Sequence, residues 1–209
     1  MERLVGAEIA RITRMVDDLL LLAKTEHNEF LRREPIDLVP FVQELWRVEV
    51  ALAARRFELG SVPAGTLTAD PDRLTQALRN LLANAIQSTA EGEGWVRLEA
   101  QALSHGGIVF RVDDDGPGIP PAERERVFHR FNRLDGARDR AAGGSGLGLA
   151  IVRAIAEAHG GGAAAVASPA GGARLELQLP GFQIGPITAA PTKRPARRSA
   201  SAAPASSSG

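Results

Sequence analysis

Cysteine is absent from the 209 residues of the sequence. Its absence excludes a disulfide framework, zinc sites with thiolate ligands and a cysteine nucleophile. Long apolar runs are also absent, because the longest are about five residues and a membrane-spanning helix needs about 20. The N-terminus lacks the basic segment, the apolar segment and the small-residue cleavage site of a secretion signal. We therefore expect the chain to cross no membrane and to lie in the cytoplasm.

Charge of one sign is not in excess, since 25 Lys and Arg residues balance 25 Asp and Glu residues. A net charge of zero gives no sign of specific nucleic-acid binding. The balance is uneven along the chain, because residues 186–209 contain four basic residues and no acidic one. This segment is rich in Ala, Pro and Ser, and it has few large apolar side chains to offset the entropy of ordering. We predict a disordered basic tail over residues 183–209.

Apolar residues near the N-terminus recur at alternating spacings of four and three. They are Val5, Ile9, Ile12, Val16, Leu19 and Ala23. This heptad rhythm predicts a helix that packs against other helices, and we assign it to residues 1–28. Its partners would come from another chain or from a missing segment, so a homodimer or heterodimer through this helix is expected. The alternative is that the helix docks on the domain that follows.

The length and the 44% hydrophobic content suit one further domain, which we expect at residues 35–182 after a polar connection. Asp70 and Pro71 predict the start of a helix, because Asp accepts hydrogen bonds from first-turn amides and Pro fits the first helical position. Other patterns predict helices at 40–56 and 147–159, and strands at 57–59, 66–68, 95–102, 108–113, 163–167 and 173–179.

Two asparagines, Asn80 and Asn84, share one face of the helix that follows Pro71. Their amides can bind a hydrated metal ion or a phosphate. Solvated asparagines at helical spacing are the more common alternative.

Three carboxylates, Asp113, Asp114 and Asp115, run from a predicted strand directly into Gly116 and Gly118. A carboxylate held at a strand end can recognise an amino group, and glycines let the backbone approach a planar ligand closely. The alternatives are an acidic turn or a calcium loop. The calcium loop would need further acids at alternate positions, where the glycines stand instead.

Glycines at 143, 144, 146 and 148 open the helix predicted at 147–159. The first-turn amides and the dipole of such a helix favour a phosphate group. The segment lacks the Lys-Ser/Thr ending of a P-loop and the preceding strand of a dinucleotide site. A flexible glycine-rich linker is the alternative.

In their order and spacing, these segments resemble the C-terminal part of a bacterial sensor histidine kinase, of the ATPase superfamily that includes gyrase-type, Hsp90-type and MutL-type proteins. The resemblance covers residues 2–180 and rests on four motifs, which are Asn80–Ile86, Asp114–Pro120, Val127–Phe131 with Arg133, and Gly144–Val152. It implies an α+β fold of two layers, a mixed sheet with helices on one face. One long helix, the second of a dimerisation hairpin, would precede this fold.

The resemblance implies a site for ATP and Mg²⁺. Asp114 would accept a hydrogen bond from the adenine amino group, while Gly116 and Gly118 let the loop close on the base. Asn84 would ligate Mg²⁺ with the assistance of Asn80.

The last two motifs would contribute to the phosphate side of that site. Backbone amides of the second glycine motif would meet the phosphates, and Arg133 could contact them. Residues 134–143 would form a mobile lid, with Phe128 and Phe131 as its packing anchors. The glycine motif consists of Gly144, Ser145, Gly146, Leu147 and Gly148.

The chain departs from the family pattern at two places. No histidine stands in the expected phosphoacceptor context, since His27 is followed by Asn28 and lacks the usual acid and proline. The sequence thus looks like a kinase that begins halfway through its hairpin. The family also often has Lys and an aromatic residue after Ile86, where this chain has Gln87, Ser88 and Thr89. This difference would weaken charge stabilisation and adenine packing.

These features predict an ATP-dependent protein-histidine kinase domain of a two-component system. It would position Mg-ATP for phosphoryl transfer to a histidine of another polypeptide, which then signals to a response regulator. The chain could be the cytoplasmic portion of a membrane-bound sensor. One alternative is a non-catalytic nucleotide-binding regulator that pairs with intact kinases. The other is an anti-sigma-type serine/threonine kinase, which the heptad helix disfavours.

Overall fold

The structure is a computed structural model, and it describes residues 31–51, 53–132 and 146–185. The helix predicted at 1–28, the lid at 134–143 and most of the predicted tail lie outside the described residues. So do three predicted site residues, Arg133, Gly144 and Ser145.

A five-stranded sheet forms one layer of the molecule. Its strand order is β2-β4-β5-β7-β6. Strand β2 runs parallel to β4, and the other three neighbouring pairs are antiparallel, so the predicted mixed sheet is confirmed. The strands are β2 (Arg56–Leu59), β4 (Trp95–Leu103), β5 (Gly107–Asp114), β6 (Gly162–Ala167) and β7 (Ala173–Pro180).

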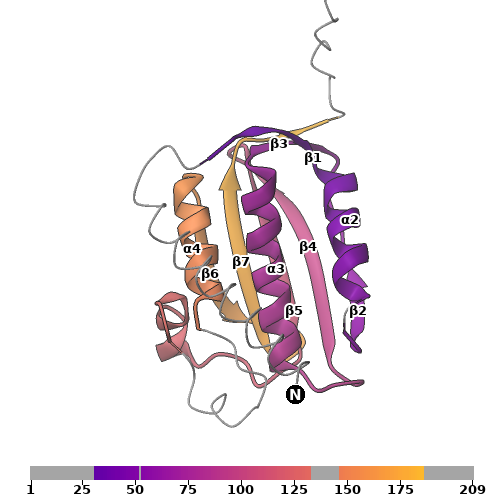
Figure 1. Ribbon diagram of the computed structural model, residues 1–209, viewed down its shortest axis with the longest axis vertical. Coiled ribbons are helices and arrows are strands. Elements are labelled where there is room, and N and C mark those ends of the chain that lie inside the picture. Colours follow the sequence, from indigo (N-terminus) through magenta and orange to yellow (C-terminus); the bar gives the residue numbers. More distant parts are fainter. Residues whose placement is uncertain (1–30, 52, 133–145, 186–209) are drawn as a thin grey trace, which may run out of the picture.

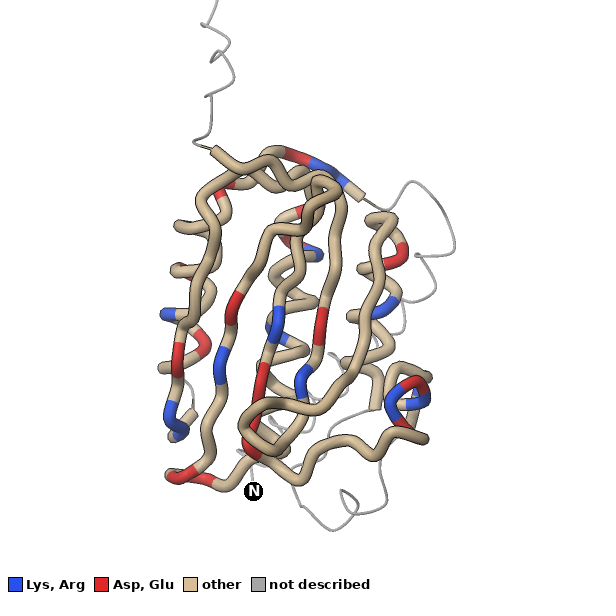
Figure 2. Tube along the Cα trace, turned by 180° about the vertical axis from the view of Figure 1, so that it is seen from behind, with Lys and Arg blue, Asp and Glu red and all other residues tan. Residues whose placement is uncertain are grey.

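Three helices form the second layer. Helices α2 (Leu38–Val50), α3 (Pro71–Ser88) and α4 (Gly148–Ala158) lie side by side on one face of the sheet (Figure 1). The opposite face carries no helix of the described chain, as the view from behind shows (Figure 2). The predicted two-layer α+β fold is therefore confirmed. None of the described helices combines the length and the apolarity that a membrane span requires.

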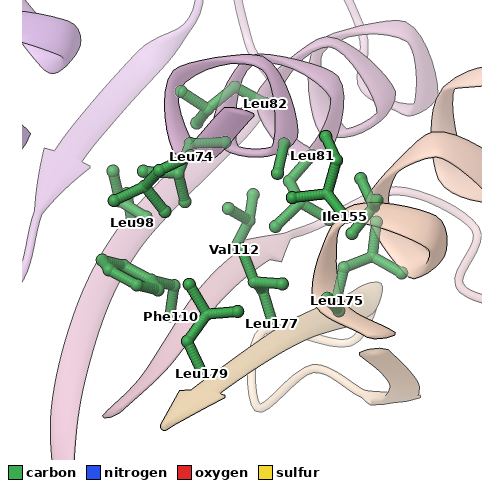
Figure 3. Close-up of a cluster of buried hydrophobic side chains, with 14 of the residues drawn as sticks. Leu74, Leu81, Leu82, Leu98, Phe110, Val112, Ile155, Leu175, Leu177 and Leu179 are labelled. Atoms are coloured by element: carbon green, nitrogen blue, oxygen red, sulfur yellow. The ribbon is translucent and has the colours of Figure 1, made fainter. Parts of the chain in front are cut away.

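The core fills the space between these layers (Figure 3). Leu74 and Leu81 of α3 are fully buried, and they face apolar side chains of the sheet. The sheet contributes Leu98, Phe110, Val112, Leu175, Leu177 and Leu179, and α4 contributes Ile155. Apolar residues three and four apart place one stripe of each helix toward the sheet, and this burial stabilises the layers.

Helix α3 begins as the sequence predicts. The Asp70 side chain accepts a hydrogen bond from the Arg73 amide at 3.0 Å, and Pro71 occupies the first helical position. At the other end, the Arg55 guanidinium donates to the carbonyls of Ile86 and Thr89. Both ends of the helix are thus capped, which fixes its length and its place over the sheet.

A smaller three-stranded sheet crosses one end of the molecule, in the order β1-β3-β8 (Figure 1). Its strands are β1 (Glu34–Asp37), β3 (Gly65–Ala69) and β8 (Phe182–Ile184). Neither β1 nor β8 was predicted, because Pro35 interrupts the strand pattern of the first and the second has three residues.

Two predicted boundaries are wrong. The tail was predicted to start at residue 183, but Gln183 and Ile184 pair with Thr66 and Gly65 in the smaller sheet. The helix predicted at 40–56 spans Leu38–Val50, and Arg56 already belongs to β2. The apolar spacing continues to Leu52 without a stop signal, so the periodicity alone misplaced the end of the helix.

Candidate nucleotide-binding site

The three aspartates at the end of β5 have different partners. Asp113 accepts two hydrogen bonds from the Arg174 guanidinium, at 2.8 and 2.9 Å. Asp115 accepts a hydrogen bond from the Trp95 amide at 2.8 Å. Asp114 lies between them and is only 1% exposed. Two of the three carboxylates therefore hold strands together, while the middle one is buried in a different environment.

The Asp114 carboxylate is only half satisfied. Its Oδ1 accepts hydrogen bonds from the amides of Gly116 at 2.9 Å and Ala173 at 3.0 Å. Its Oδ2 is buried and has no hydrogen-bond partner within the part of the chain that the structure describes. Burial raises the pKa of Asp114 and outweighs the two backbone hydrogen bonds, which lower it. A buried acceptor without a partner is costly, so Oδ2 marks a place where a ligand can donate.

Glycines surround this carboxylate because side chains would not fit. A Cβ on Gly116 would lie 2.7 Å from the Ser88 carbonyl oxygen, at the end of α3. Gly118 has a φ of +74°, in the left-handed region that favours glycine. The structure thus places Gly116 and Gly118 in the loop that follows Asp114, as the resemblance implied.

Gly172 belongs to the same cradle, and the sequence analysis did not single it out. A Cβ at this position would overlap Oδ1 of Asp114 and the Gly116 amide. In the sequence it is one of two glycines in the turn between β6 and β7, and that local pattern does not reveal that the turn abuts β5. Only the pairing of β5 with β7 places Gly172 beside Asp114, so the sequence alone could not identify it.

Asn80 and Asn84 lie one turn apart on α3, and both are half-buried. A Cβ on Gly148 would come within 3.7 Å of the Asn80 side-chain oxygen, so the start of α4 lies against Asn80. The Asn80 Nδ2 is buried without a hydrogen-bond partner among the described residues. This second unsatisfied polar atom belongs to a side chain that lies against the N-terminal end of α4, where a phosphate would be stabilised.

The second glycine motif enters α4 with an unusual backbone. Gly146 has a φ of +70°, and a Cβ there would lie 3.1 Å from the Phe131 Cα. Leu147 occupies the N-cap position of α4 and has no polar side chain to satisfy the first-turn amides. The structure brings Gly148 close to Asn80, and Leu147 and Gly146 precede it in the chain. Phe128 is buried and Phe131 is 62% exposed, and the lid that both were predicted to anchor lies outside the described residues.

Helix α3 connects the two ends of the candidate site. Its C-terminal carbonyl at Ser88 lies against Gly116, and Asn84 and Asn80 lie about 6 and 12 Å further along the helix. The described residues contain no group of three or more His, Asp or Glu side chains that could hold a metal ion. Amide oxygens alone suit an ion that takes most of its ligands from phosphates and water, as magnesium does.

A groove of about 290 Å³ lies elsewhere, between α4 and the 3₁₀ turn Arg126–Phe128. Arg153 crosses it, 4.8 Å above the Phe128 ring, and pairs with Glu125 at 2.7 Å. None of the predicted site residues lines this groove. Its Arg153 is already engaged by Phe128 and Glu125, so we assign the nucleotide site to the Asp114 region.

Comparison with known proteins assigns the family. The family described as "Histidine kinase-, DNA gyrase B-, and HSP90-like ATPase" matches residues 69–182. The match covers more than half of the 209 residues, so the chain belongs to this family.

Individual relatives narrow the comparison to sensor kinases. The chain is 39% identical over 178 residues to the probable sensor histidine kinase TcrY of Mycobacterium tuberculosis (strain ATCC 25618 / H37Rv), covering 84% of this chain and 37% of that protein. Sensor histidine kinase CpxA of Escherichia coli (strain K12) is 36% identical over 185 residues, covering 84% of this chain and 38% of that protein. The chain therefore spans well under half of the length of the curated relatives it matches.

A solved structure agrees with this assignment. The ATP-binding domain of PrrB from Mycobacterium tuberculosis superimposes with a TM-score of 0.56 at 30% identity. The match covers 71% of this chain and 97% of that domain.

Proposed function

We propose that this chain binds Mg-ATP and is the catalytic ATP-binding domain of a two-component sensor histidine kinase. The observation that carries the proposal is the buried Asp114 Oδ2, an acceptor that has no partner among the described residues and lies in a glycine-lined cradle. The adenine amino group is a donor of matching chemistry, whereas guanine presents an acceptor oxygen at that position. The site should therefore prefer ATP to GTP.

Each group of residues contacts a different part of the nucleotide. Asp114 accepts from the adenine amino group, and Gly116, Gly118 and Gly172 leave room for the base. Asn84 ligates Mg²⁺ and Asn80 assists, while the backbone amides of Gly146, Leu147 and Gly148 meet the phosphates. Arg133, Gly144 and Ser145 are assigned to the phosphate side by the family pattern alone. When bound, Mg²⁺ neutralises phosphate charge and orients the terminal phosphoryl group.

The chain supplies positioning rather than a nucleophile. Transfer breaks the bond between the γ-phosphorus and its bridging oxygen, which leaves with ADP, and forms a bond to an imidazole nitrogen. The acceptor histidine comes from another polypeptide or from a segment outside this sequence, and a response regulator receives the phosphoryl group next. The N-terminal helix at 1–28 is proposed to dimerise, and the cytoplasm is the proposed location. Holding the reacting groups in line is the main catalytic contribution of such a site.

Phosphotransfer to an added hairpin tests the kinase function. The chain is mixed with γ-labelled ATP, Mg²⁺ and the phosphoacceptor hairpin of the Mycobacterium tuberculosis relative, supplied as a separate polypeptide. We expect label on this hairpin, no label on a version whose acceptor histidine is replaced by glutamine, and none when the chain carries Asp114→Asn. Nucleotide binding without any transfer would contradict the kinase function and favour the regulator that pairs with intact kinases.

A further inference from the structure

Acidic and basic residues alternate along the strands of the five-stranded sheet (Figure 2). One of its ion pairs joins Asp113 of β5 to Arg174 of β7, which are register partners in the sheet. Both carboxylate oxygens of Asp113 accept from Arg174, at 2.8 and 2.9 Å. The Asp113 side chain is 2% exposed and that of Arg174 is 21% exposed. A bidentate pair with this burial holds its two strands in a defined geometry.

This pair is directly adjacent to the adenine-recognition carboxylate. Asp114 follows Asp113 in β5, and Ala173 precedes Arg174 in β7. The Ala173 amide donates to the Asp114 Oδ1 at 3.0 Å. Successive side chains of a strand point to opposite faces, so the ion pair lies on one face and the Asp114 side chain on the other. Two neighbouring links therefore join β5 to β7 at the strand ends. One is the Asp113–Arg174 ion pair, and the other is the hydrogen bond from the Ala173 amide to Asp114.

These two links lie where the pairing of β5 with β7 stops. Beyond Asp114 the chain turns into the Gly116 loop, and before Ala173 it comes from the turn that contains Gly172. No further register pair beyond Asp113 and Arg174 joins β5 to β7 at this end of the described sheet. On its other side Asp114 remains paired with Val96 of β4. Toward β7, the Asp113–Arg174 pair is the last ion pair of the described sheet that holds the backbone carrying Asp114.

We propose that Asp113 and Arg174 form a positioning pair, which holds the Asp114 carboxylate where it recognises the adenine amino group. This inference rests on the proposed nucleotide-binding function. Neither residue touches the nucleotide, so both act through the backbone of β5 and β7. Pre-organisation of this kind matters because displacement of a recognition group by about 1 Å weakens binding substantially.

The sheet itself supplies a matched control. Arg111 of β5 pairs with Glu176 of β7 at 2.8 Å, and its side chain is 21% exposed, as is that of Arg174. The Arg111 pair lies on the same face and joins the same two strands, two register steps from Asp113. Neither Arg111 nor Glu176 is adjacent in the sequence to a residue of the candidate site. Loss of either pair should affect the sheet to a similar degree, and only loss of the Arg174 pair should affect Asp114.

The experiment compares Arg174→Gln with Arg111→Gln in the full chain. Binding of a non-hydrolysable ATP analogue with Mg²⁺ is measured by calorimetry, and thermal unfolding of each variant is measured in parallel. We expect roughly tenfold weaker binding for Arg174→Gln and a change of less than about twofold for Arg111→Gln. Equal affinity in the wild type and Arg174→Gln, or equal losses in both variants, would overturn the positioning role.

A second readout is independent of nucleotide. Asp113 is one of the charges that raise the pKa of Asp114, so removal of its Arg174 partner should raise the pKa of Asp114 further. Asp113→Asn should lower it, and Arg111→Gln should leave it unchanged. Carboxyl carbon NMR titration of the nucleotide-free chain measures these directions. The absence of opposite shifts in the Asp113 and Arg174 variants would overturn the inference.

The two experiments also separate failure of this inference from failure of the proposed function. A wild-type chain that binds no nucleotide would contradict the proposed function, while the titration would still decide whether the pair controls Asp114. If Arg174→Gln does not fold, Asp113→Asn replaces it in the calorimetric comparison, because asparagine keeps the shape of the side chain and removes its charge. The titration then compares Asp113→Asn, which should lower the pKa of Asp114, with Arg111→Gln, which should leave it unchanged.

Discussion

Asp113, Asp114 and Asp115 are consecutive, yet the fold gives each a separate task. Asp113 and Asp115 accept hydrogen bonds that join neighbouring strands. Asp114 has a buried oxygen without a partner among the described residues, and burial raises its pKa. A carboxyl group with a raised pKa destabilises the folded chain at neutral pH, because the ionised form is the costly one. Such a cost at one residue is typical of a functional site rather than of a structural one.

Substitution of Gly172 tests the fit around Asp114. Gly172→Ala places a Cβ against Oδ1 of Asp114 and the Gly116 amide, so we expect a loss of about 1–3 kcal/mol in the free energy of unfolding. Chemical denaturation measures it. Gly162→Ala is the control, because a Cβ at Gly162 meets no atom within 4 Å in the described chain. Equal stability of the two variants would show that the cradle around Asp114 is looser than described.

At the residue scale, the sequence predicted those site residues that lie close together in the chain. It missed a residue that only the fold brings to the site. Asp114, Gly116 and Gly118 follow one another in the chain, and the structure keeps them together. Gly172 was missed because it joins them only through the pairing of β5 with β7. Phe131 was expected to anchor the lid at 134–143, which lies outside the described residues, and its side chain is 62% exposed with a φ of +61°.

At the scale of elements, a buried histidine joins the ends of two helices. His159 follows α4, and its Nε2 accepts a hydrogen bond from the Asp70 amide at the start of α3, at 3.1 Å. Its Nδ1 lies 2.7 Å from the Ile155 carbonyl oxygen. An imidazole that accepts at one nitrogen and donates at the other is neutral. The link therefore holds α3 and α4 together only while His159 is unprotonated.

This link predicts a pH dependence of stability. Burial lowers the pKa of His159 below its ordinary value near 6.5, and the charge of Arg33 lowers it further, against opposing effects of Ile155 and Asp70. Between the lowered pKa and 6.5, the unfolded chain binds more protons than the folded one. The stability contribution is thus complete above about 6.5 and is lost as pH falls toward the folded pKa.

Urea denaturation between pH 8 and pH 5 measures this loss. We expect His159→Gln to flatten the pH dependence in that range, since glutamine can still accept from the Asp70 amide and does not titrate. His105→Gln removes an exposed histidine in the turn between β4 and β5 and should leave the dependence unchanged. An identical profile for the wild type and His159→Gln would contradict the buried neutral state.

Helices and strands were predicted correctly where the residues that signal them lie close together in the sequence. The Asp70-Pro71 start of α3 was correct because a cap and its helix are adjacent in the chain. Strands β4 and β5 were found from alternation and their connecting turn. Strands β1 and β8 were missed, because each is short and is held by distant β3 rather than by its own pattern.

At the scale of the whole molecule, the folded unit is larger than the family match. The match begins at residue 69, but β1, α2 and β2 precede it and pack on the same core. The sheet β1-β3-β8 joins the segment near residue 34 to the segment near residue 184. The described residues form two layers, and none of their helices covers the second face of the main sheet (Figure 2). Ion pairs between β5 and β7 lie on that face, Arg111 with Glu176 and Arg174 with Asp113.

The central claim is that this unit is a nucleotide-binding domain that recognises adenine through Asp114. The most direct test is calorimetric binding of a non-hydrolysable ATP analogue with Mg²⁺ to the wild type, Asp114→Asn and Asp115→Asn. Asparagine at 114 can keep the hydrogen bonds from Gly116 and Ala173, but it presents a donor where the adenine amino group needs an acceptor. Asp115→Asn is the control, because asparagine there still accepts from the Trp95 amide.

We predict that the wild type and Asp115→Asn bind the analogue and that Asp114→Asn binds at least about tenfold more weakly, the usual effect of losing a hydrogen bond to a charged group. Asp114→Asn should unfold at the same or a higher denaturant concentration, since it removes a buried charge. A wild-type chain without affinity for the analogue, or Asp114→Asn with undiminished affinity, would contradict the account.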